Sequence, residues 1–545
     1  MDNRNIKNGN VIRSDGYSDQ PYIVITDDNH WLMTVTVCTG EEGQQGQHVI
    51  SMRSADKGVT WKDERDVSPV TLPESSYSVL YKTVYGRIYC FYNYNADNLR
   101  TVKADSPPYP DGYCTRVDTQ GHFVYRYSDD NGISWSDRWY DIPQRMFEVD
   151  RNNPYGGEIK FFWNVGKPFE LDREVYVPLY KIGAFGIGFM RYSEGVLLKC
   201  SNINTEKDPS KLVWETLPDG EIGIRAPREE SIISEEHSFV TLSDGSIFCV
   251  FRTISGHPYC CYSRDKGHTF TEPLPMTYKD GRKMKHPRAA NFIWKCLNGK
   301  YIYWFHNHGG KWYDDRNPVW LCGAVEKKTS FGTVLVFGEP VPVLYDENPA
   351  IRISYPDFVE DDGEYYLTET QKEIARVHKI DKELVEGLWN QRSESDIWTD
   401  ISQNMPDEKM LSLKENSFSL KFEISEGTNP EILFSTMVGA SGIEIRRNSE
   451  GFIEILAGDG QRMHLFLNDD ELLQDGKKHT VTAVFDAGVC AVYFVTDGRF
   501  CDGAEKRQFG FTRFDKELRH VYGLERPRVN KLSKLFYCEG IHLYD

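Results

Sequence analysis

The sequence predicts an all-β fold, in which a six-bladed β-propeller is followed by a β-sandwich of the jelly-roll kind. Residues 20–375 consist of short runs of Val, Ile, Tyr, Phe and Trp, separated by Asp-Gly, Asn-Gly and Gly-Gly turns. This pattern is typical of consecutive antiparallel hairpins. One short motif recurs within the same stretch at wide intervals, as expected where a fold repeats one sheet around an axis. The β pattern resumes after residue 410 without that motif.

The recurring motif has the composition of a tight hairpin turn. It occupies residues 54–61, 128–135 and 263–270, with Ser first, Asp third, Gly fifth and an aromatic residue last. Asp accepts hydrogen bonds from turn amides, Gly takes a positive φ, and the aromatic side chain packs into its sheet. The motif resembles the Asp-box, or BNR repeat, of sialidase-like β-propellers, which implies a structural role on the face opposite the active site. The stretch has room for about six four-stranded blades, with seven as the alternative.

The pattern divides the chain into three parts. We assign residues 1–375 to the propeller, as the catalytic domain, and residues 376–410 to a linker. Apolar residues at helical spacing in 379–390 predict a short helix within the linker. Residues 411–545 resemble a laminin-G or concanavalin-like β-sandwich. Such a domain either binds glycans or braces the catalytic domain, and the sequence leaves both alternatives open.

Charge and hydropathy exclude several classes of partner. Lys and Arg total 64 against 82 for Asp and Glu, which gives the 545-residue chain a net charge of −18. This balance disfavours binding to nucleic-acid phosphates, and no run approaches the roughly 20 apolar residues of a membrane span. The first ten residues contain no apolar segment of a secretory signal. We therefore expect no nucleic-acid or membrane partner and a cytoplasmic location, or a periplasmic or secreted one if the chain is a mature form.

No cofactor pattern is present. The sequence contains no nucleotide-, haem- or flavin-binding pattern, and none of its twelve cysteines forms a CxxC pair. We therefore expect no cofactor and no metal site, zinc included. A structural calcium ion is compatible with either domain, but no residue pattern specifies one.

Further elements of the sialidase-like family occur in order along the chain. The segments that carry this resemblance are residues 234–245, 250–252, 315–317 and 354–358. Sialidase-like enzymes bind a carboxylate sugar with three arginines and cleave it with a tyrosine nucleophile, which a glutamate tunes. The resemblance implies that Tyr355 is the nucleophile, Glu236 its modulator, and Arg252 and Arg316 two of the arginines.

Two elements of the family pattern are missing. Asp19 stands where the first arginine is expected, and a carboxylate there would repel the carboxylate of a sialic acid. The acid/base aspartate is expected in the loop 40–48, which contains no Asp but offers Glu42 or His48 in its place. The sugar is therefore not expected to be a standard sialic acid.

A second cluster of ionisable residues follows the third copy of the motif. Two strand-like runs joined by an Asn-Gly turn separate His286 from His306, which predicts that the two histidines lie at the same end of a blade. Histidines suit proton transfer near pH 7. The arrangement resembles propeller-type polysaccharide lyases, in which His286 and His306 would share the base and acid roles with Tyr355 during β-elimination at a uronate.

Other polar and aromatic side chains are expected to line the same face and bind substrate. They are Arg288, His308, Lys311, Trp312, Tyr313, Asn153 and Lys167.

The sequence therefore favours a glycoside hydrolase that cleaves a terminal acidic sugar from a glycan, with an acidic glycan or oligosaccharide as its partner. One alternative is a polysaccharide lyase acting at a uronate such as rhamnosyl-glucuronate. Another is a glycan-binding propeller without catalysis. The density of ionisable residues in 286–316 favours an enzyme over a lectin.

Overall fold

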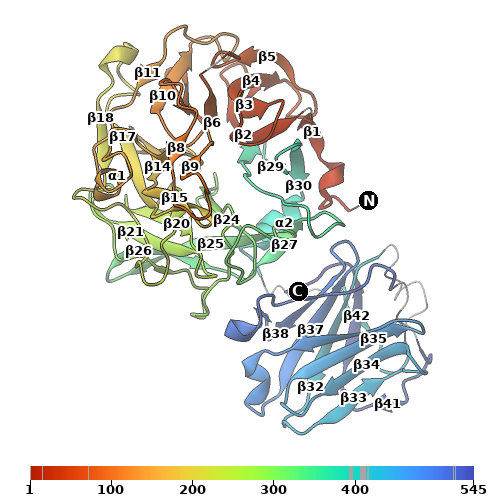
Figure 1. Ribbon diagram of the computed structural model, residues 1–545. Helices are drawn as coiled ribbons and strands as arrows, with labels where there is room; N and C mark the ends of the chain where they lie inside the picture. The colour runs from red at the N-terminus through yellow and green to blue at the C-terminus, as the bar shows by residue number, and fades with distance from the viewer. Residues whose placement is uncertain are drawn as a thin grey trace.

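The computed structural model describes residues 2–544 except 15, 72, 392–396, 406–412, 414, 415, 519, 520 and 522. Residues 10–380 form six antiparallel sheets, each with a path of four strands, arranged around a common centre (Figure 1). Each of the first five sheets uses strands that follow one another along the chain, as the hairpin pattern predicts. The sixth ends with β1 (Asn10–Arg13), which pairs with β30 (Ala375–Ile380) and closes the ring. The all-β class and the propeller are confirmed.

The first sheet contains β2 (Tyr17–Ile25), β3 (Trp31–Cys38), β4 (His48–Ser54) and β5 (Lys62–Asp66). The second contains β6 (Ser75–Lys82), β7 (Ile88–Tyr94), β10 (His122–Ser128) and β11 (Tyr140–Asp141). The third contains β12 (Phe162–Trp163), β14 (Glu174–Lys181), β17 (Glu194–Cys200) and β18 (Trp214–Leu217), and β13 (Phe169–Leu171) pairs with β14. The fourth sheet contains β19 (Glu235–Thr241), β20 (Ile247–Arg252), β21 (Tyr259–Ser263) and β22 (Leu274–Pro275). The fifth contains β23 (Phe292–Lys295), β24 (Tyr301–Phe305), β25 (Val319–Thr329) and β26 (Gly332–Phe337), and β27 (Val341–Leu344) pairs with β25. The sixth contains β28 (Phe358–Asp361), β29 (Glu364–Thr370), β30 and β1.

Two short hairpins project from this frame. They are β8 (Val102–Lys103) with β9 (Tyr113–Cys114), and β15 (Ala184–Gly186) with β16 (Phe189–Arg191). The helical turns are equally short: α1 (Glu148–Arg151), η1 (Ile6–Asn8) and η2 (Pro209–Lys211).

The three motif turns have the hydrogen bonds that their composition predicts. In the first copy, Ser54 Oγ accepts from the backbone N–H of Gly58, and Asp56 Oδ1 accepts from that of Thr60, both at 2.8 Å. Gly58 has a φ of +82°, which its lack of a Cβ permits. Trp61 packs against the apolar core between the first and sixth sheets. Such locally encoded turns connect the outer strands of three blades.

The linker begins later than its sequence range suggests. Strand β30 belongs to the sixth sheet, so the propeller continues to Ile380. The short helix that the spacing predicts is α2 (Lys382–Gly387), whose first turn is capped by Asp381. No helix among the described residues is both long and apolar enough to cross a membrane.

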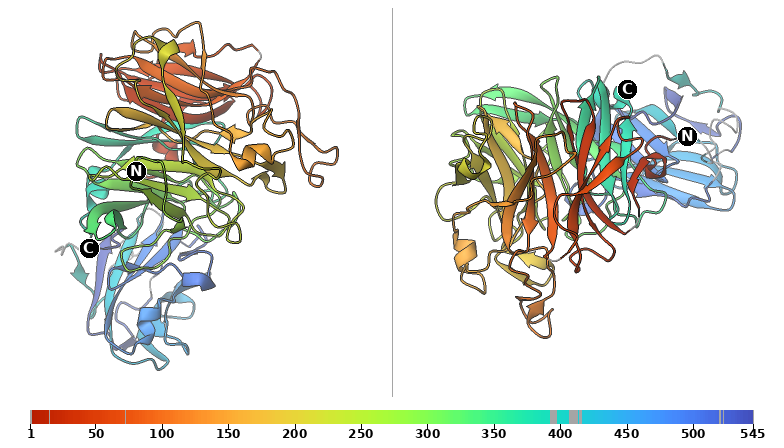
Figure 2. Two further views of the ribbon diagram at one scale, coloured as in Figure 1. Left: turned by 90° about the vertical axis from the view of Figure 1, so that its left-hand side faces the viewer. Right: turned by 90° about the horizontal axis from the view of Figure 1, so that it is seen from above.

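The C-terminal part is a sandwich of two sheets beside the propeller (Figure 2). One sheet contains β31 (Thr399–Asp400), β42 (Leu535–Glu539), β32 (Phe418–Ile424), β37 (His479–Asp486), β38 (Ala491–Thr496), β39 (Arg499–Phe500) and β40 (Thr512–Arg513). The other contains β36 (Met463–Asn468), β35 (Ile453–Asp459), β34 (Ser441–Arg447), β33 (Glu431–Ser435) and β41 (Val529–Asn530), and the turns η3 (Glu471–Gln474) and η4 (Ala504–Lys506) lie in the connections. Apolar side chains from both sheets, such as Phe422 and Ile455, form one shared core.

The sandwich packs on the fifth propeller sheet through aromatic side chains. The Trp320 ring on β25 lies with its centroid 5.3 Å from that of Tyr493 and 5.2 Å from that of Phe500. Arg4 adds an ion pair to Asp486 at 2.8 Å. The two domains therefore share an apolar core rather than being joined by the linker alone.

Replacing Trp320 by Ala should lower the free energy of unfolding by about 3–5 kcal/mol, because it removes the largest side chain of this shared core. Trp320 is 1% exposed. Chemical unfolding of wild type and variant measures the difference, and Phe331→Ala, at an 87% exposed position, is the control with little expected effect. A loss as small as that of the control would show that the interface adds little stability.

Candidate active site

One cavity of about 290 Å³ opens at the centre of the ring, and all six sheets or their loops supply its wall. It is lined by Glu42, Arg116, Trp163, Phe189, Met190, Glu236, Arg252, Tyr313, Arg316, Arg352, Ser354, Tyr355, Thr370 and Lys372. The Glu42 loop precedes β4, whereas the first motif turn follows β4. The pocket and this turn therefore lie at opposite ends of the strand, as the family resemblance implies.

Tyr355 and Glu236 form a hydrogen-bonded pair inside the pocket. The Tyr355 hydroxyl donates to Glu236 Oε1 at 2.8 Å, and the two side chains are 5% and 1% exposed. A shift of register between Glu235 and Ser238 in β19 marks a bulge, and bulges redirect side chains. Glu236 at φ +55° and Tyr355 at φ +48° both have a left-handed backbone, which non-glycine residues seldom adopt. The fold thus brings together two residues that the sequence assigned to one reaction.

Burial sets the proton positions in this pair. It raises the pKa of Tyr355 well above its ordinary value, and the adjacent Glu236 carboxylate raises it further. Burial also raises the pKa of Glu236, although Arg252 and the Tyr355 hydroxyl favour its ionised form. At neutral pH the tyrosine is therefore protonated, and Glu236 is the group positioned to accept its proton.

Arg252 is held between two carboxylates. Its guanidinium lies 2.8 Å from Glu235 and 2.8 Å from Glu236. Glu235 also pairs with Arg288 at 2.6 Å, and these two guanidiniums outweigh burial, so the pKa of Glu235 is lowered. Arg288 additionally donates to the backbone carbonyl oxygens of Gly188 and Met190, so this buried side chain fastens the β15–β16 hairpin and does not line the pocket.

Arg316 differs from the other cations of the pocket. Among the described residues no carboxylate lies within ion-pair distance of it, whereas Arg116, Arg252, Arg352 and Lys372 each have at least one. It donates to Ser354 Oγ at 2.7 Å and to the Tyr313 carbonyl at 2.9 Å, and it is 5% exposed. Burial lowers its pKa. A buried guanidinium without a counter-ion at a pocket wall is suited to an anionic group of a ligand.

Lys372 occupies the region from which the first family arginine is missing. Its ammonium lies 2.5 Å from Asp19 and 3.2 Å from Glu42, and 4.2 Å from the centroid of the Tyr355 ring. The turn between β29 and β30 carries it, in a segment without a motif. Sequence reasoning missed this residue, although a buried Asp19 by itself calls for a cation nearby. Asp19 is fully buried, which raises its pKa.

Glu42 faces the pocket, whereas the other acid/base candidate does not. Burial raises the pKa of Glu42, but Lys372 and Arg116 lower it more strongly, to about 2. His48 lies at the start of β4, where Nδ1 bonds to the Gly46 carbonyl, and it is absent from the wall. Of the two alternatives, the geometry therefore favours Glu42.

Replacing Lys372 by Met should destabilise the protein by about 2–4 kcal/mol at pH 7, because the Asp19 and Glu42 carboxylates lose the cation that they share. The folded pKa of Glu42 lies below its ordinary value of 4.5, so its stabilisation is present above pH 4.5 and is lost as the pH falls towards about 2. The difference in free energy of unfolding between wild type and variant should therefore shrink as the pH falls from 4.5 towards about 2. Thermal unfolding at a series of pH values measures it.

Lys82→Met is the matched control for this pH series. Lys82 pairs with the exposed Asp27 at 2.6 Å, and such a surface pair contributes at most about 1 kcal/mol. A destabilisation by Lys372→Met that is as small as this, or that stays constant from pH 7 to pH 3, would show that Lys372 does not stabilise the ionised carboxylates of Asp19 and Glu42.

Arg116 and Asp118 form a further part of the site that sequence reasoning missed. Arg116 pairs with Asp118 at 2.7 Å and with Glu42 at 3.5 Å, and its guanidinium lies over the rings of Trp163 and Phe189. These residues come from the second and third blades and share no motif. Their charge and stacking fix the wall behind Glu42.

The two histidines of the second cluster lie side by side but behind the pocket. The rings of His286 and His306 are stacked with centroids 6.0 Å apart, and both residues are fully buried. His286 Nε2 donates to the Ala289 carbonyl, and its Nδ1 accepts from the His306 backbone N–H. Burial lowers the pKa of His286 to about 3 and that of His306 well below its usual range. Neither ring is part of the wall.

The remaining expected binding residues are dispersed. Tyr313 lines the pocket, and the adjacent Lys311 and Trp312 are exposed. His308 stacks on Phe509 of the sandwich domain, with ring centroids 4.8 Å apart. The structure thus brings only one of these side chains to the pocket wall.

Asn153 and Lys167 also point elsewhere. The Asn153 side chain closes its own loop by accepting from the Tyr155 N–H and donating to the Ile159 carbonyl. Lys167 pairs with Asp357 at 2.8 Å. Both side chains have structural partners, and neither lines the cavity.

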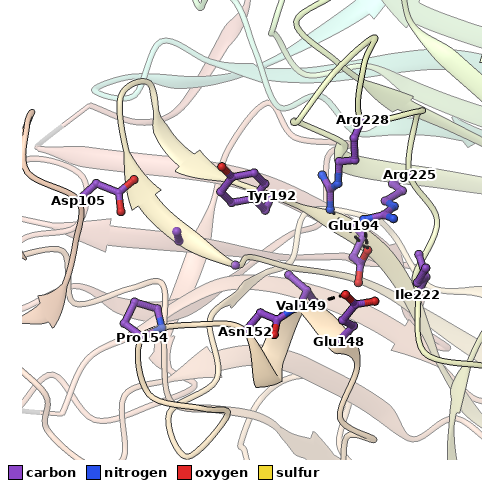
Figure 3. Close-up of a pocket in the computed structure, with 12 residues that line it drawn as sticks. Asp105, Glu148, Val149, Asn152, Pro154, Tyr192, Glu194, Ile222, Arg225 and Arg228 are labelled. Carbon is purple, nitrogen blue, oxygen red and sulfur yellow. Dashed lines mark hydrogen bonds and ion pairs between the residues drawn. The ribbon is translucent and has the colours of Figure 1, made fainter.

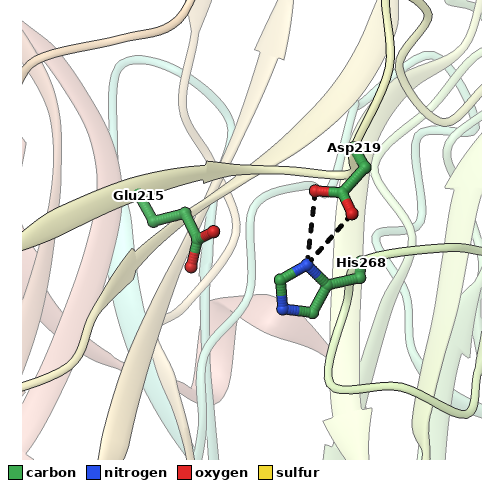
Figure 4. Close-up of side chains that lie close together, drawn as sticks. All are labelled: Glu215, Asp219 and His268. Carbon is green, nitrogen blue, oxygen red and sulfur yellow. Dashed lines mark hydrogen bonds and ion pairs between the residues drawn. The ribbon is translucent and has the colours of Figure 1, made fainter.

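One group of side chains in the described part of the chain has the spacing of metal ligands. Glu215, Asp219 and His268 offer ligand atoms within 4.8 Å of one another (Figure 4). His268 lies in the third motif turn and pairs with Asp219 at 3.2 Å, while Lys199 lies 3.7 Å from Glu215. His268 and Glu215 thus each have a partner within the protein.

No protein-family model and no curated protein sequence matches the chain. Among solved structures, it is similar to a protein of unknown function from Dyadobacter fermentans, at 15% identity and a TM-score of 0.48 over 68% of this chain and 97% of that one. It is also similar to the leech intramolecular trans-sialidase, at 12% identity and a TM-score of 0.47 over 69% and 70% of the two chains. The intramolecular trans-sialidase from Ruminococcus gnavus has 13% identity and a TM-score of 0.46, over 69% of this chain and 97% of its own. At such low identity a likeness can concern only the fold, and the chemistry rests on this chain's own residues.

Proposed function

We propose that this protein is a glycoside hydrolase that removes a terminal acidic sugar from a glycan, with Tyr355 as its nucleophile. The hydrogen bond of 2.8 Å between Tyr355 and Glu236 in the central pocket carries this proposal. A neutral tyrosine is a weak nucleophile, and an adjacent base activates it by taking its proton. Glu236 has the position and the raised pKa that this task needs.

The reaction proceeds in two displacements. Tyr355 Oη bonds to the anomeric carbon as its proton passes to Glu236, and the bond from that carbon to the leaving oxygen breaks. The leaving oxygen takes a proton from Glu42. Water then attacks the same carbon and gives a proton to Glu42, while the bond to Tyr355 breaks and Glu236 returns the proton. Two inversions retain the anomeric configuration.

The first displacement requires Glu42 to carry a proton, although its pKa is about 2. Lys372 and Arg116 are the cations that lower this pKa. An acidic sugar bound beside them would offset their charge and raise the pKa of Glu42. Binding of the acidic substrate thus prepares the acid for its role, which a neutral sugar would not do.

The unpaired Arg316 supports an acidic substrate. It is the pocket cation with a buried guanidinium and no carboxylate partner among the described residues. A sugar carboxylate at this place would supply the missing counter-ion. Asp19 and Lys372 replace the first family arginine with an ion pair, so the sugar differs from a standard sialic acid.

The geometry favours hydrolysis over β-elimination. A lyase of the kind considered above needs His286 and His306 at the substrate, and both rings are fully buried outside the pocket wall. A lectin needs no nucleophile paired with a base, so the Tyr355–Glu236 contact also favours an enzyme over a binding protein.

The purified protein should be incubated with rhamnose-capped arabinogalactan, sialylated oligosaccharides and other acidic glycans. Released sugars are identified while ultraviolet absorbance reports any unsaturated uronate. Sugar release with flat absorbance and retained configuration is expected. Rising absorbance matched to release would establish the lyase instead, and binding of an acidic glycan without any release would establish the lectin.

A further inference from the structure

A second cavity, of about 420 Å³, lies beside the β15–β16 hairpin (Figure 3). Phe189 and Met190 of this hairpin line the catalytic pocket, whereas Ala184 lines the second cavity. The hairpin is fastened at its tip, because Gly188 O accepts from Arg288 at 2.6 Å and from the Tyr313 hydroxyl at 3.0 Å. One fixed wall therefore separates two adjacent cavities.

A buried carboxylate without a complete set of partners faces this cavity. Glu194 is 1% exposed, and its Oε1 atom makes no hydrogen bond to the described residues. Its Oε2 atom lies 3.7 Å from Arg225 and 3.6 Å from Arg228, which is longer than a direct hydrogen bond. Buried polar atoms are almost always satisfied, so this oxygen calls for a donor from a bound molecule or water.

The two arginines are also available to a ligand. The Arg225 side chain is 30% exposed and forms an ion pair with Glu194. Its guanidinium donates no hydrogen bond to the described residues. Arg228 is anchored to the Ile232 carbonyl, and burial together with Arg225 lowers its pKa to about 10. Figure 3 shows Glu148 and Asn152 near the same space, opposite Tyr192. The cavity wall therefore carries both cationic and anionic side chains.

The presence of both charges in the wall favours an uncharged ligand. An anion would meet the Glu148 and Glu194 carboxylates, and a cation would meet the two guanidiniums. A neutral hydroxyl both donates and accepts, so hydroxyl groups can satisfy both kinds of side chain. The Tyr192 ring, 41% exposed, and Ile222, 44% exposed, add apolar surface for the C–H face of a sugar.

We propose that the second cavity binds a neutral sugar residue of the glycan whose acidic end enters the catalytic pocket. The placement on one glycan rests on the proposed function, whereas sugar binding in this cavity does not. The hairpin then separates the subsite for the cleaved sugar from the subsite for a more distant residue of the chain.

Saturation-transfer NMR tests this proposal with lactose, cellobiose and xylobiose as neutral probes, and with glucuronate and glucosamine as charged ones. We expect transfer to at least one neutral disaccharide in the wild type, and at least a several-fold loss in Tyr192→Asn and Arg225→Met. Asn suits the Tyr192 backbone, whose φ is +56°. The control is Phe331→Asn, at an 87% exposed position that lines neither cavity, and it should retain the transfer.

The proposal would be overturned if no neutral probe received transfer, or if Tyr192→Asn and Arg225→Met gave the same transfer as the wild type. Stronger transfer to a charged probe than to the neutral ones would overturn it as well. Turnover is measured separately. Transfer that depends on Tyr192 in a protein without turnover would leave the cavity assignment intact while the proposed function fails.

Discussion

Replacing Tyr355 by Phe is expected to lower kcat on the order of 10⁴-fold, because the change removes the only atom of this side chain that can bond to the anomeric carbon. The ring and its packing remain, and Glu236 keeps the ion pair with Arg252 at 2.8 Å. KM should change much less than kcat, since the hydroxyl contributes mainly in the transition state. Initial rates on the acidic glycan found to be cleaved measure both parameters.

Tyr278→Phe is the matched control for this substitution. Tyr278 is 3% exposed, and its hydroxyl has no hydrogen-bond partner among the described residues. Its loss should leave kcat within about twofold of wild type. Thermal unfolding checks that Tyr355→Phe is folded. If the folded variant kept a kcat within about twofold of wild type, Tyr355 would not be the nucleophile.

Replacing Arg316 by Met is expected to reduce kcat/KM for the acidic substrate by about 10²-fold, because a charge-assisted hydrogen bond to the sugar carboxylate is lost. The same glycan with its carboxylate reduced to an alcohol should be affected far less. Comparing the two substrates in wild type and variant separates loss of charge recognition from general damage.

The control for Arg316 is Arg352→Met. Arg352 also lines the pocket, but its side chain is 55% exposed and pairs with Asp314 at 3.0 Å. Its loss should change kcat/KM by no more than about threefold. An equal reduction for the acidic and the reduced substrate in Arg316→Met would indicate that Arg316 holds the Ser354 side chain and the Tyr313 backbone rather than the substrate.

Arg252 and Arg316 both line the pocket, but they differ in their partners. Glu235 and Glu236 neutralise Arg252, so Arg252 stabilises the pocket and the charge of Glu236. Arg316 has no such partner among the described residues and is left for an anion. The family resemblance assigns both arginines to the substrate, and the ion pairs distinguish their roles.

Sequence alone determined the features that depend on neighbouring residues. The alternation of apolar runs and Gly-containing turns specified hairpins, and the Ser–Asp–Gly motif specified turns that the structure builds with the expected hydrogen bonds. The resemblance to the sialidase-like family implies that Glu236, Arg252, Arg316 and Tyr355 belong to one site. The predictions of hairpins and turns are confirmed because strand period and turn chemistry act over a few residues.

Only the tertiary structure decided which of these side chains reach the pocket. Lys372 meets Asp19 because the turn after β29 returns to the first blade, 353 positions away in the chain. His286 and His306 lie close together as their hairpin requires, but ring closure buries them behind the pocket wall. Burial, ion pairing and the pKa values that follow depend on side chains from all six sheets meeting at one centre, and no local pattern in the sequence encodes that meeting.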